Sequence, residues 1–129
     1  MNNISSRNHH VSPNNALNME VTDRLINAAK QLSVICDKSI KKIESKTIVA
    51  HATNPLDYAW QHHEQYLIKW GGMGAKTLML GMNPGPWGMA QTGIPFGSTD
   101  IAKNQLEIKP HKLETPKNAH PKRPILGLE

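Results

Sequence analysis

The clearest pattern along the chain is a helical stripe that begins near Val21. Apolar residues then recur at spacings of three and four, which predicts an amphipathic helix. They are Leu25, Ile26, Ala29, Leu32, Ile35, Cys36, Ile40 and Ile43. Thr22 or Asp23 is placed to cap the start of this helix. Residues 1–18 are rich in Asn, Ser and His and have no hydrophobic period, so we expect a disordered tail there and a folded part from 19 to 129.

A second helix is predicted after Asn54-Pro55, a pair that forces extended or turn geometry. Apolar and aromatic residues then fall roughly on one side of a helix, which Gly71-Gly72 would end. They are Leu56, Ala59, Trp60, His63, Leu67 and Trp70. The β-branched run Thr47–Val49 is at most a weak strand.

A buried strand is predicted at Thr77–Leu80, a continuous apolar run between glycines. From Met82 to Gly97 the chain is interrupted by repeated glycines and prolines, which predicts a long ordered loop. Loops of this length are usually functional. Beyond it we expect a short helix at 101–108, a basic proline-broken connector, and the start of a strand at 125–128.

Composition narrows the class of protein. The 129 residues are enough for one domain, although only 5% are aromatic, which is little for an independently stable core. The net charge of +5 mildly favours a polyanionic partner such as nucleic acid. The single cysteine, Cys36, rules out an internal disulfide and is expected to be buried. No signal peptide and no membrane span are expected.

The segment Gly81–Gly97, GMNPGPWGMAQTGIPFG, resembles the first motif of the uracil-DNA glycosylases of the single-strand-selective monofunctional kind. NPLDYAW at 54–60 and HPKRPILGLE at 120–129 are also similar to that family, so the resemblance runs from about residue 50 to the end. One difference is Trp87, which stands where phenylalanine is more usual. The resemblance implies a three-layer α/β/α fold around a parallel sheet.

The implied activity is hydrolysis of the N-glycosidic bond of uracil, and of some oxidised pyrimidines, in single- and double-stranded DNA. It would serve base excision repair in the nucleus, with a monomeric enzyme, no cofactor and no metal. By the resemblance, Asn83 positions the attacking water, because an amide can orient water but cannot take its proton near neutral pH. Phe96 would stack on the extruded base, and Met82 and Gly85 would contact the base or line its pocket.

Simpler interpretations of these residues stay open. Asn83 could be an ordinary turn residue ahead of Pro84, Phe96 could be a core residue, and Met82 could fill a core. Ala75 replaces the glycine that a phosphate-binding loop needs before its lysine in GGMGAKT, so that motif is not favoured. Adjacent His62 and His63 point to different sides of a helix and lack further ligands at metal spacing.

The resemblance also implies parts that this chain does not supply. These are the rest of the sheet, a second asparagine that reads uracil, a catalytic histidine in a His-Pro-Ser segment, and the wedge that enters DNA. His120-Pro121 is followed by Lys122 and aligns elsewhere, so we expect His120, Lys122 and Arg123 to be exposed, with at most a weak phosphate contact. The first hypothesis is therefore the incomplete N-terminal part of a uracil-excising enzyme. The alternative is a truncated, non-catalytic product that binds DNA weakly.

Overall fold

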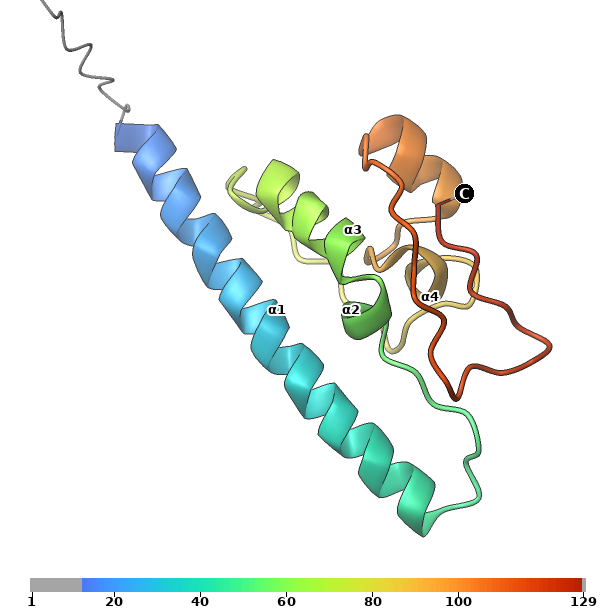
Figure 1. Ribbon diagram of the computed structural model, residues 1–129. Helices are drawn as coiled ribbons and strands as arrows, with labels where there is room; N and C mark the ends of the chain where they lie inside the picture. Colours follow the sequence, from blue (N-terminus) through green and yellow to red (C-terminus); the bar gives the residue numbers. More distant parts are fainter. Residues whose placement is uncertain (1–12, 129) are drawn as a thin grey trace, which may run out of the picture.

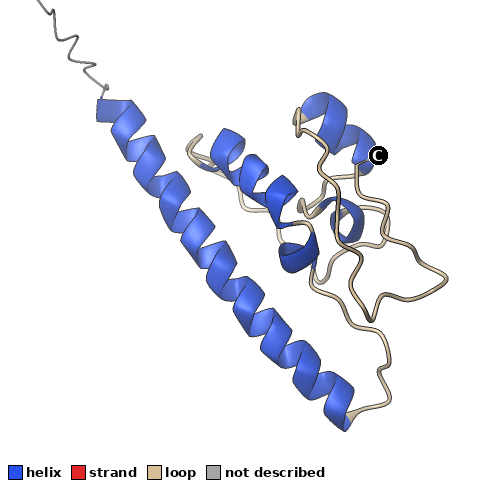
Figure 2. Ribbon diagram, in the orientation of Figure 1, coloured by secondary structure: helices blue, strands red, loops and turns tan. Residues whose placement is uncertain are grey.

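The computed structural model describes residues 13–128, and within that range the chain forms helices and loops (Figures 1 and 2). One long helix, α1 (Pro13–Lys46), lies along one side of the molecule. The chain then turns back and packs α2 (Pro55–Tyr58), α3 (Trp60–Tyr66) and the π-helical turn η1 (Leu67–Gly71) beside it. The short helix α4 (Met89–Thr92) and the π-helical turn η2 (Ile101–Gln105) follow on the side away from α1.

Helix α1 confirms the helical stripe but begins earlier than expected. It starts at Pro13, so Thr22 and Asp23 lie inside it and do not cap it. Residues 13–18, which we assigned to the tail, are helical, and residues 1–12 of that tail lie outside the described residues.

Asn54 fixes the start of α2 and joins it to α1. Its Oδ1 accepts from the Leu56 backbone N–H at 3.1 Å, which is a side-chain cap. Its Nδ2 donates to the Ser33 hydroxyl at 2.9 Å and to the Asp37 carboxylate at 3.0 Å, both on α1. One buried amide therefore sets the position of the second helix against the first.

The expected helix over 56–70 is confirmed, with a break at one residue. Ala59 has φ −110° and ψ 24°, outside the helical region, and this separates α2 from α3. Leu56, Ala59 and Leu67 are buried, as the stripe predicts. His62 and His63 are both buried as well, because this short helical unit is covered on more than one side.

The predicted strands are absent from the described residues, so the α/β prediction is not confirmed here. Thr77–Leu80 has no regular secondary structure, and Leu78 and Leu80 are 86% and 88% exposed. A strand exists only when a neighbour accepts its backbone hydrogen bonds, and residues 13–128 place none beside this segment. Residues 125 and 126 have no regular structure and residues 127 and 128 form a turn, with Leu128 fully buried in the core.

The hydrophobic core is formed mainly by residues from the second half of the chain. Its fully or nearly fully buried members are Ile94, Ala102, Ile108 and Leu128, and Tyr66 and Leu106 pack against them. The expected short helix after residue 100 is confirmed as η2, which Leu106 ends by donating to the Ile101 carbonyl at 2.9 Å.

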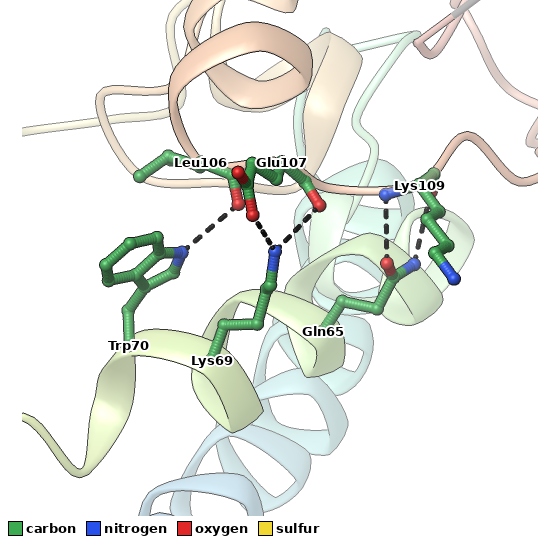
Figure 3. Close-up of polar contacts among 6 residues, drawn as sticks. All are labelled: Gln65, Lys69, Trp70, Leu106, Glu107 and Lys109. Carbon is green, nitrogen blue, oxygen red and sulfur yellow. Dashed lines mark hydrogen bonds and ion pairs between the residues drawn. The ribbon is translucent and has the colours of Figure 1, made fainter.

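A row of polar contacts connects α3 and η1 to the segment that follows η2 (Figure 3). Lys69 forms an ion pair with Glu107 at 2.8 Å, and Trp70 Nε1 donates to the Leu106 carbonyl at 3.2 Å. The Gln65 amide bonds both backbone groups of Lys109. The bond from Lys69 holds the pKa of Glu107 below its usual value. No described helix is both long and apolar enough to cross a membrane.

Candidate functional site: the Gly81–Gly97 loop

The loop from Gly81 to Gly97 is held in shape by a buried threonine at the end of α4. Thr92 Oγ1 donates to the Gly97 carbonyl at 2.8 Å and accepts from the Ile94 N–H at 3.1 Å. Thr92 and Ile94 are fully buried. Because one hydroxyl bonds two backbone groups three residues apart, the Ile94 N–H and the Gly97 carbonyl, the end of the loop is closed on itself.

Side chains of α2 and α3 form hydrogen bonds to the backbone of this loop. The Tyr58 hydroxyl donates to the Ala90 carbonyl at 2.6 Å, and His63 Nδ1 lies 2.7 Å from the Gly93 carbonyl. A carbonyl can only accept, so His63 carries its proton on Nδ1. Burial raises the pKa of Tyr58 to about 12 and lowers the pKa of His63, so both side chains stay neutral at physiological pH.

Gly93 allows α4 to lie directly on α2 and α3. Its φ of 73° is left-handed, and a Cβ there would stand 2.8 Å from both the Cβ and the carbonyl oxygen of Ala59. Any other residue would meet both backbone strain and a collision. The glycine that follows α4 is therefore required by the packing.

The loop lines a hollow of about 900 Å³. Leu32, Cys36 and Ile40 of α1 form the wall facing the loop. The loop side includes all four predicted site residues, which are Met82, Asn83, Gly85 and Phe96. The structure thus brings these four to one cavity. Cys36, expected to be buried, is half-buried because this cavity opens beside it.

Asn83 stands exposed at the edge of the cavity. Its Nδ2 donates to the Pro84 carbonyl at 3.3 Å, and within residues 13–128 no group donates to its Oδ1. The local bond to Pro84 is the turn chemistry of the simpler interpretation, and it leaves the amide oxygen available as an acceptor. Met82 is 100% exposed, so it is not a core filler.

Phe96 has an unusual backbone for a phenylalanine. Its φ is 55°, in the left-handed region, and 56% of the residue is exposed, so it is not a core residue. The ring reaches the backbone of Gly81, where a Cβ would lie 3.4 Å from Cζ. Strained, exposed aromatic residues are typical of binding sites, since packing alone would not keep this conformation.

Gly85 is not required by close packing against the described chain. A Cβ there would meet nothing within 4 Å, so no neighbouring backbone of the described chain needs the space. The space opens to the cavity. The absence of a side chain at this position leaves room at the wall of the cavity, and no close contact within residues 13–128 requires it.

The cavity is chemically neutral and mostly apolar. Its described lining residues include no charged side chain and no histidine. Such a surface can hold a flat, uncharged ring and present an amide oxygen to a water molecule. It contains no group that could stabilise a leaving anion by charge. Nor does any group of three or more potential metal ligands occur in the part of the chain described.

Sequence reasoning missed Gln91, which joins the loop to the 120–128 segment. Its Nε2 donates to the carbonyls of Pro86 and Pro124, at 3.1 and 3.2 Å, and its Oε1 accepts from the Leu126 N–H at 2.8 Å. A single glutamine in a loop gives no signal of this role. Its bonds explain how HPKRPILGLE comes to lie against the motif.

A neutral cavity edged by an exposed asparagine amide and an exposed aromatic ring is an arrangement expected of base-excising DNA glycosylases, and comparison with known proteins finds homologues of one particular kind. The chain is 41% identical over 90 residues to the single-strand selective monofunctional uracil DNA glycosylase of Bos taurus, a match that covers 70% of this chain and 33% of that protein. It is 50% identical over 76 residues to the proteins of the same name from Mus musculus and Rattus norvegicus.

Over these matched stretches the chain is a homologue of the single-strand selective monofunctional uracil-DNA glycosylases. The match spans about a third of the bovine relative, and 27% of each rodent relative. No model of a protein family matches the chain.

Proposed function

We propose that this chain carries the water-positioning and base-stacking part of a uracil-DNA glycosylase site. The observation that carries this proposal is the convergence of Asn83, Phe96, Met82 and Gly85 on one neutral cavity, in a chain homologous to named uracil-DNA glycosylases. The substrate is uracil in DNA, with some oxidised pyrimidines, in single and double strands. The site of action is the nucleus, in base excision repair, and the protein acts as a monomer.

The proposed hydrolysis uses uncharged side chains only. Asn83 Oδ1 accepts a hydrogen bond from a water molecule. This bond orients the water so that a lone pair of the water oxygen points at the anomeric carbon of the sugar. The glycosidic bond breaks toward an oxocarbenium-like sugar, and the electron pair leaves with the uracil as an anion. Water then adds to the sugar carbon and releases its proton to solvent. The protein contributes position and orientation, which require no ionised group.

The finer fold belongs to the same proposal. In an α/β/α arrangement the apolar segment 77–80 is a strand of a parallel sheet, and the loop from Gly81 leaves its carboxyl end, where ligand sites lie in such folds. The exposure of Leu78, Met79 and Leu80 supports this assignment, because 78 and 80 would face one covering layer of a central strand and 79 would face the other.

The test is uracil release from single-stranded DNA by this chain and by Asn83→Ala and Asn83→Asp. If Asn83 orients the water, Asn83→Ala lowers the rate by about 10²- to 10³-fold, as loss of one positioned polar group does elsewhere. Release that survives in Asn83→Ala excludes the mechanism. Asn27→Ala, the same change at an exposed position of α1 outside the lining of the cavity, is the control for handling and folding.

A second candidate is a non-catalytic product that binds DNA weakly. The observation that favours it is the absence of any charged or histidine side chain among the described lining residues, since a uracil anion would then leave without help. No release by the unchanged chain, together with measurable binding to single-stranded DNA, would support this candidate over the first.

A further inference from the structure

A smaller hollow lies next to the main cavity, on the side of the 118–125 segment. Its volume is about 130 Å³, the space of roughly four water molecules. Thr53 lines both hollows, and Pro86 of the smaller one stands between Gly85 and Trp87 of the larger. We name it the histidine pocket, after His51 and His120 in its wall.

The two histidines are held in defined orientations. His51 Nδ1 donates to the Asn118 carbonyl at 3.1 Å, and His120 Nδ1 accepts from the Lys122 N–H at 3.1 Å. The ring proton of neutral His120 is therefore on Nε2, where it is free to donate. The rings meet edge to face with centroids 4.9 Å apart, so His51 positions His120.

The histidine pocket has a basic lining with no acidic side chain among its described residues. Arg123 lines it and is tied to His120 through a turn, with the Arg123 N–H donating to the His120 carbonyl at 2.9 Å. The described lining residues include no Asp or Glu. Glu44, the carboxylate connected to this network, bonds the Asn118 side chain and lines a different hollow.

We propose that the histidine pocket binds a DNA phosphate next to the nucleotide whose base enters the main cavity. Arg123 and His120 Nε2 donate to the phosphate oxygens, and a guanidinium with an imidazole suits a tetrahedral oxyanion. A base and its phosphate are separated by one sugar, which matches two hollows that share a wall. The proposal rests on the proposed function for the occupant of the main cavity.

The first arm of the test measures binding of a thymine-only single-stranded oligonucleotide to the full chain as salt is raised. Arg123→Gln is expected to weaken binding about three- to tenfold and to reduce the slope of log K against log salt by about 0.7, the value of one phosphate contact on a single strand. Arg24→Gln on α1 removes the same charge outside both hollows and should change the slope by less than half as much. Equal slopes for the two variants would overturn the proposal.

His120→Asn tests the other donor without disturbing the turn. The asparagine oxygen can still accept from the Lys122 N–H, whereas the donor at Nε2 is lost. We expect weaker oligonucleotide binding by about threefold, and no change for His111→Gln, a histidine outside the pocket. A matching loss in His111→Gln would assign the effect to general charge or folding and reject the proposal.

The second arm titrates inorganic phosphate and follows the histidine side-chain signals by NMR. Shifts of His51 and His120, but not of His111, that disappear in Arg123→Gln support the pocket. If phosphate binds there while the oligonucleotide slope is unaffected, the pocket takes free phosphate and the assignment to DNA is wrong. Because the oligonucleotide contains no uracil, a slope effect without uracil release would support the phosphate site and refute only the proposed activity.

Discussion

His63 Nδ1 and the Gly93 carbonyl oxygen are 2.7 Å apart, and this bond joins helix α3 to the end of the motif loop. Both groups are shielded from water, and the Tyr58–Ala90 bond at 2.6 Å makes a parallel connection from α2. The loop that carries Asn83 and Phe96 is therefore oriented by side chains about 30 residues earlier in the chain.

Replacing His63 by Phe should destabilise the protein by about 1–3 kcal/mol, because it leaves the Gly93 carbonyl buried without a donor. Urea unfolding at pH 7.5 measures this. Tyr58→Phe should cost about 1 kcal/mol. If both bonds hold the same loop, the double variant loses less than the two single losses added together. A His63→Phe protein within about 0.5 kcal/mol of the unchanged chain would show that the bond does not stabilise the fold.

Gly93→Ala should be among the most damaging small substitutions in the chain. It combines a left-handed φ with a Cβ 2.8 Å from Ala59, and we expect a loss of about 3 kcal/mol or more. Gly74→Ala is the matched control, because Gly74 has nearly the same φ, 70°, with nothing within 4 Å. Its loss should be about 1 kcal/mol, the backbone part alone. Equal thermal melting temperatures for the two variants would contradict the packing argument.

The helices predicted from the sequence are confirmed, whereas the predicted strands are not formed within residues 13–128, and both outcomes have one physical reason. The hydrogen bonds of α1 and α3 join residues four apart, so the local pattern contains what is needed. A strand at 77–80 depends on partners elsewhere, and residues 13–128 provide none. The same lack of local signal explains the wrong start of α1: residues 14–18 show no hydrophobic period, yet they continue a helix that later residues establish.

The site was predicted in part. Asn83, Phe96, Met82 and Gly85 came from an unusual local motif, and they do line one cavity. Their roles in catalysis and base binding stay predictions. The supports His63 and Gln91 could not be predicted, because each bonds a backbone group about 30 residues away and its own neighbours give no sign of it.

Stability should fall as the pH drops below about 6.5. Burial lowers the pKa of both His62 and His63 in the folded protein, while both take protons near pH 6.5 when unfolded. Above pH 6.5 the two states hold equal numbers of protons at these sites. Below it the unfolded state binds protons first, so each histidine costs up to about 1.4 kcal/mol per pH unit until the folded pKa is passed.

Urea unfolding at pH 7.5, 6.5 and 5.5 measures this dependence. His62 accepts from the His111 N–H at 2.9 Å through Nε2, so protonation would also break that bond. His63→Phe should show a shallower decline, because one of the two titrating groups is gone. Glu107, whose pKa is lowered from 4.5, acts only at more acidic pH and does not disturb the comparison. Stability that rises between pH 7.5 and 5.5 would refute the assignment.

Phe96 offers a test that separates binding from folding. If its ring stacks on an extruded base, Phe96→Ala should weaken binding to uracil-containing single-stranded DNA by about 1–3 kcal/mol, whereas Phe96→Tyr keeps the aromatic face and most of the affinity. Because 56% of the residue is exposed, Phe96→Ala should cost little stability. Phe96→Gly should bind as weakly as Phe96→Ala. Its free energy of unfolding should be about 1 kcal/mol higher than that of Phe96→Ala, since glycine accepts the φ of 55° without strain. If Phe96→Ala binds as well as the unchanged chain, the strained ring serves packing against Gly81 and not the base.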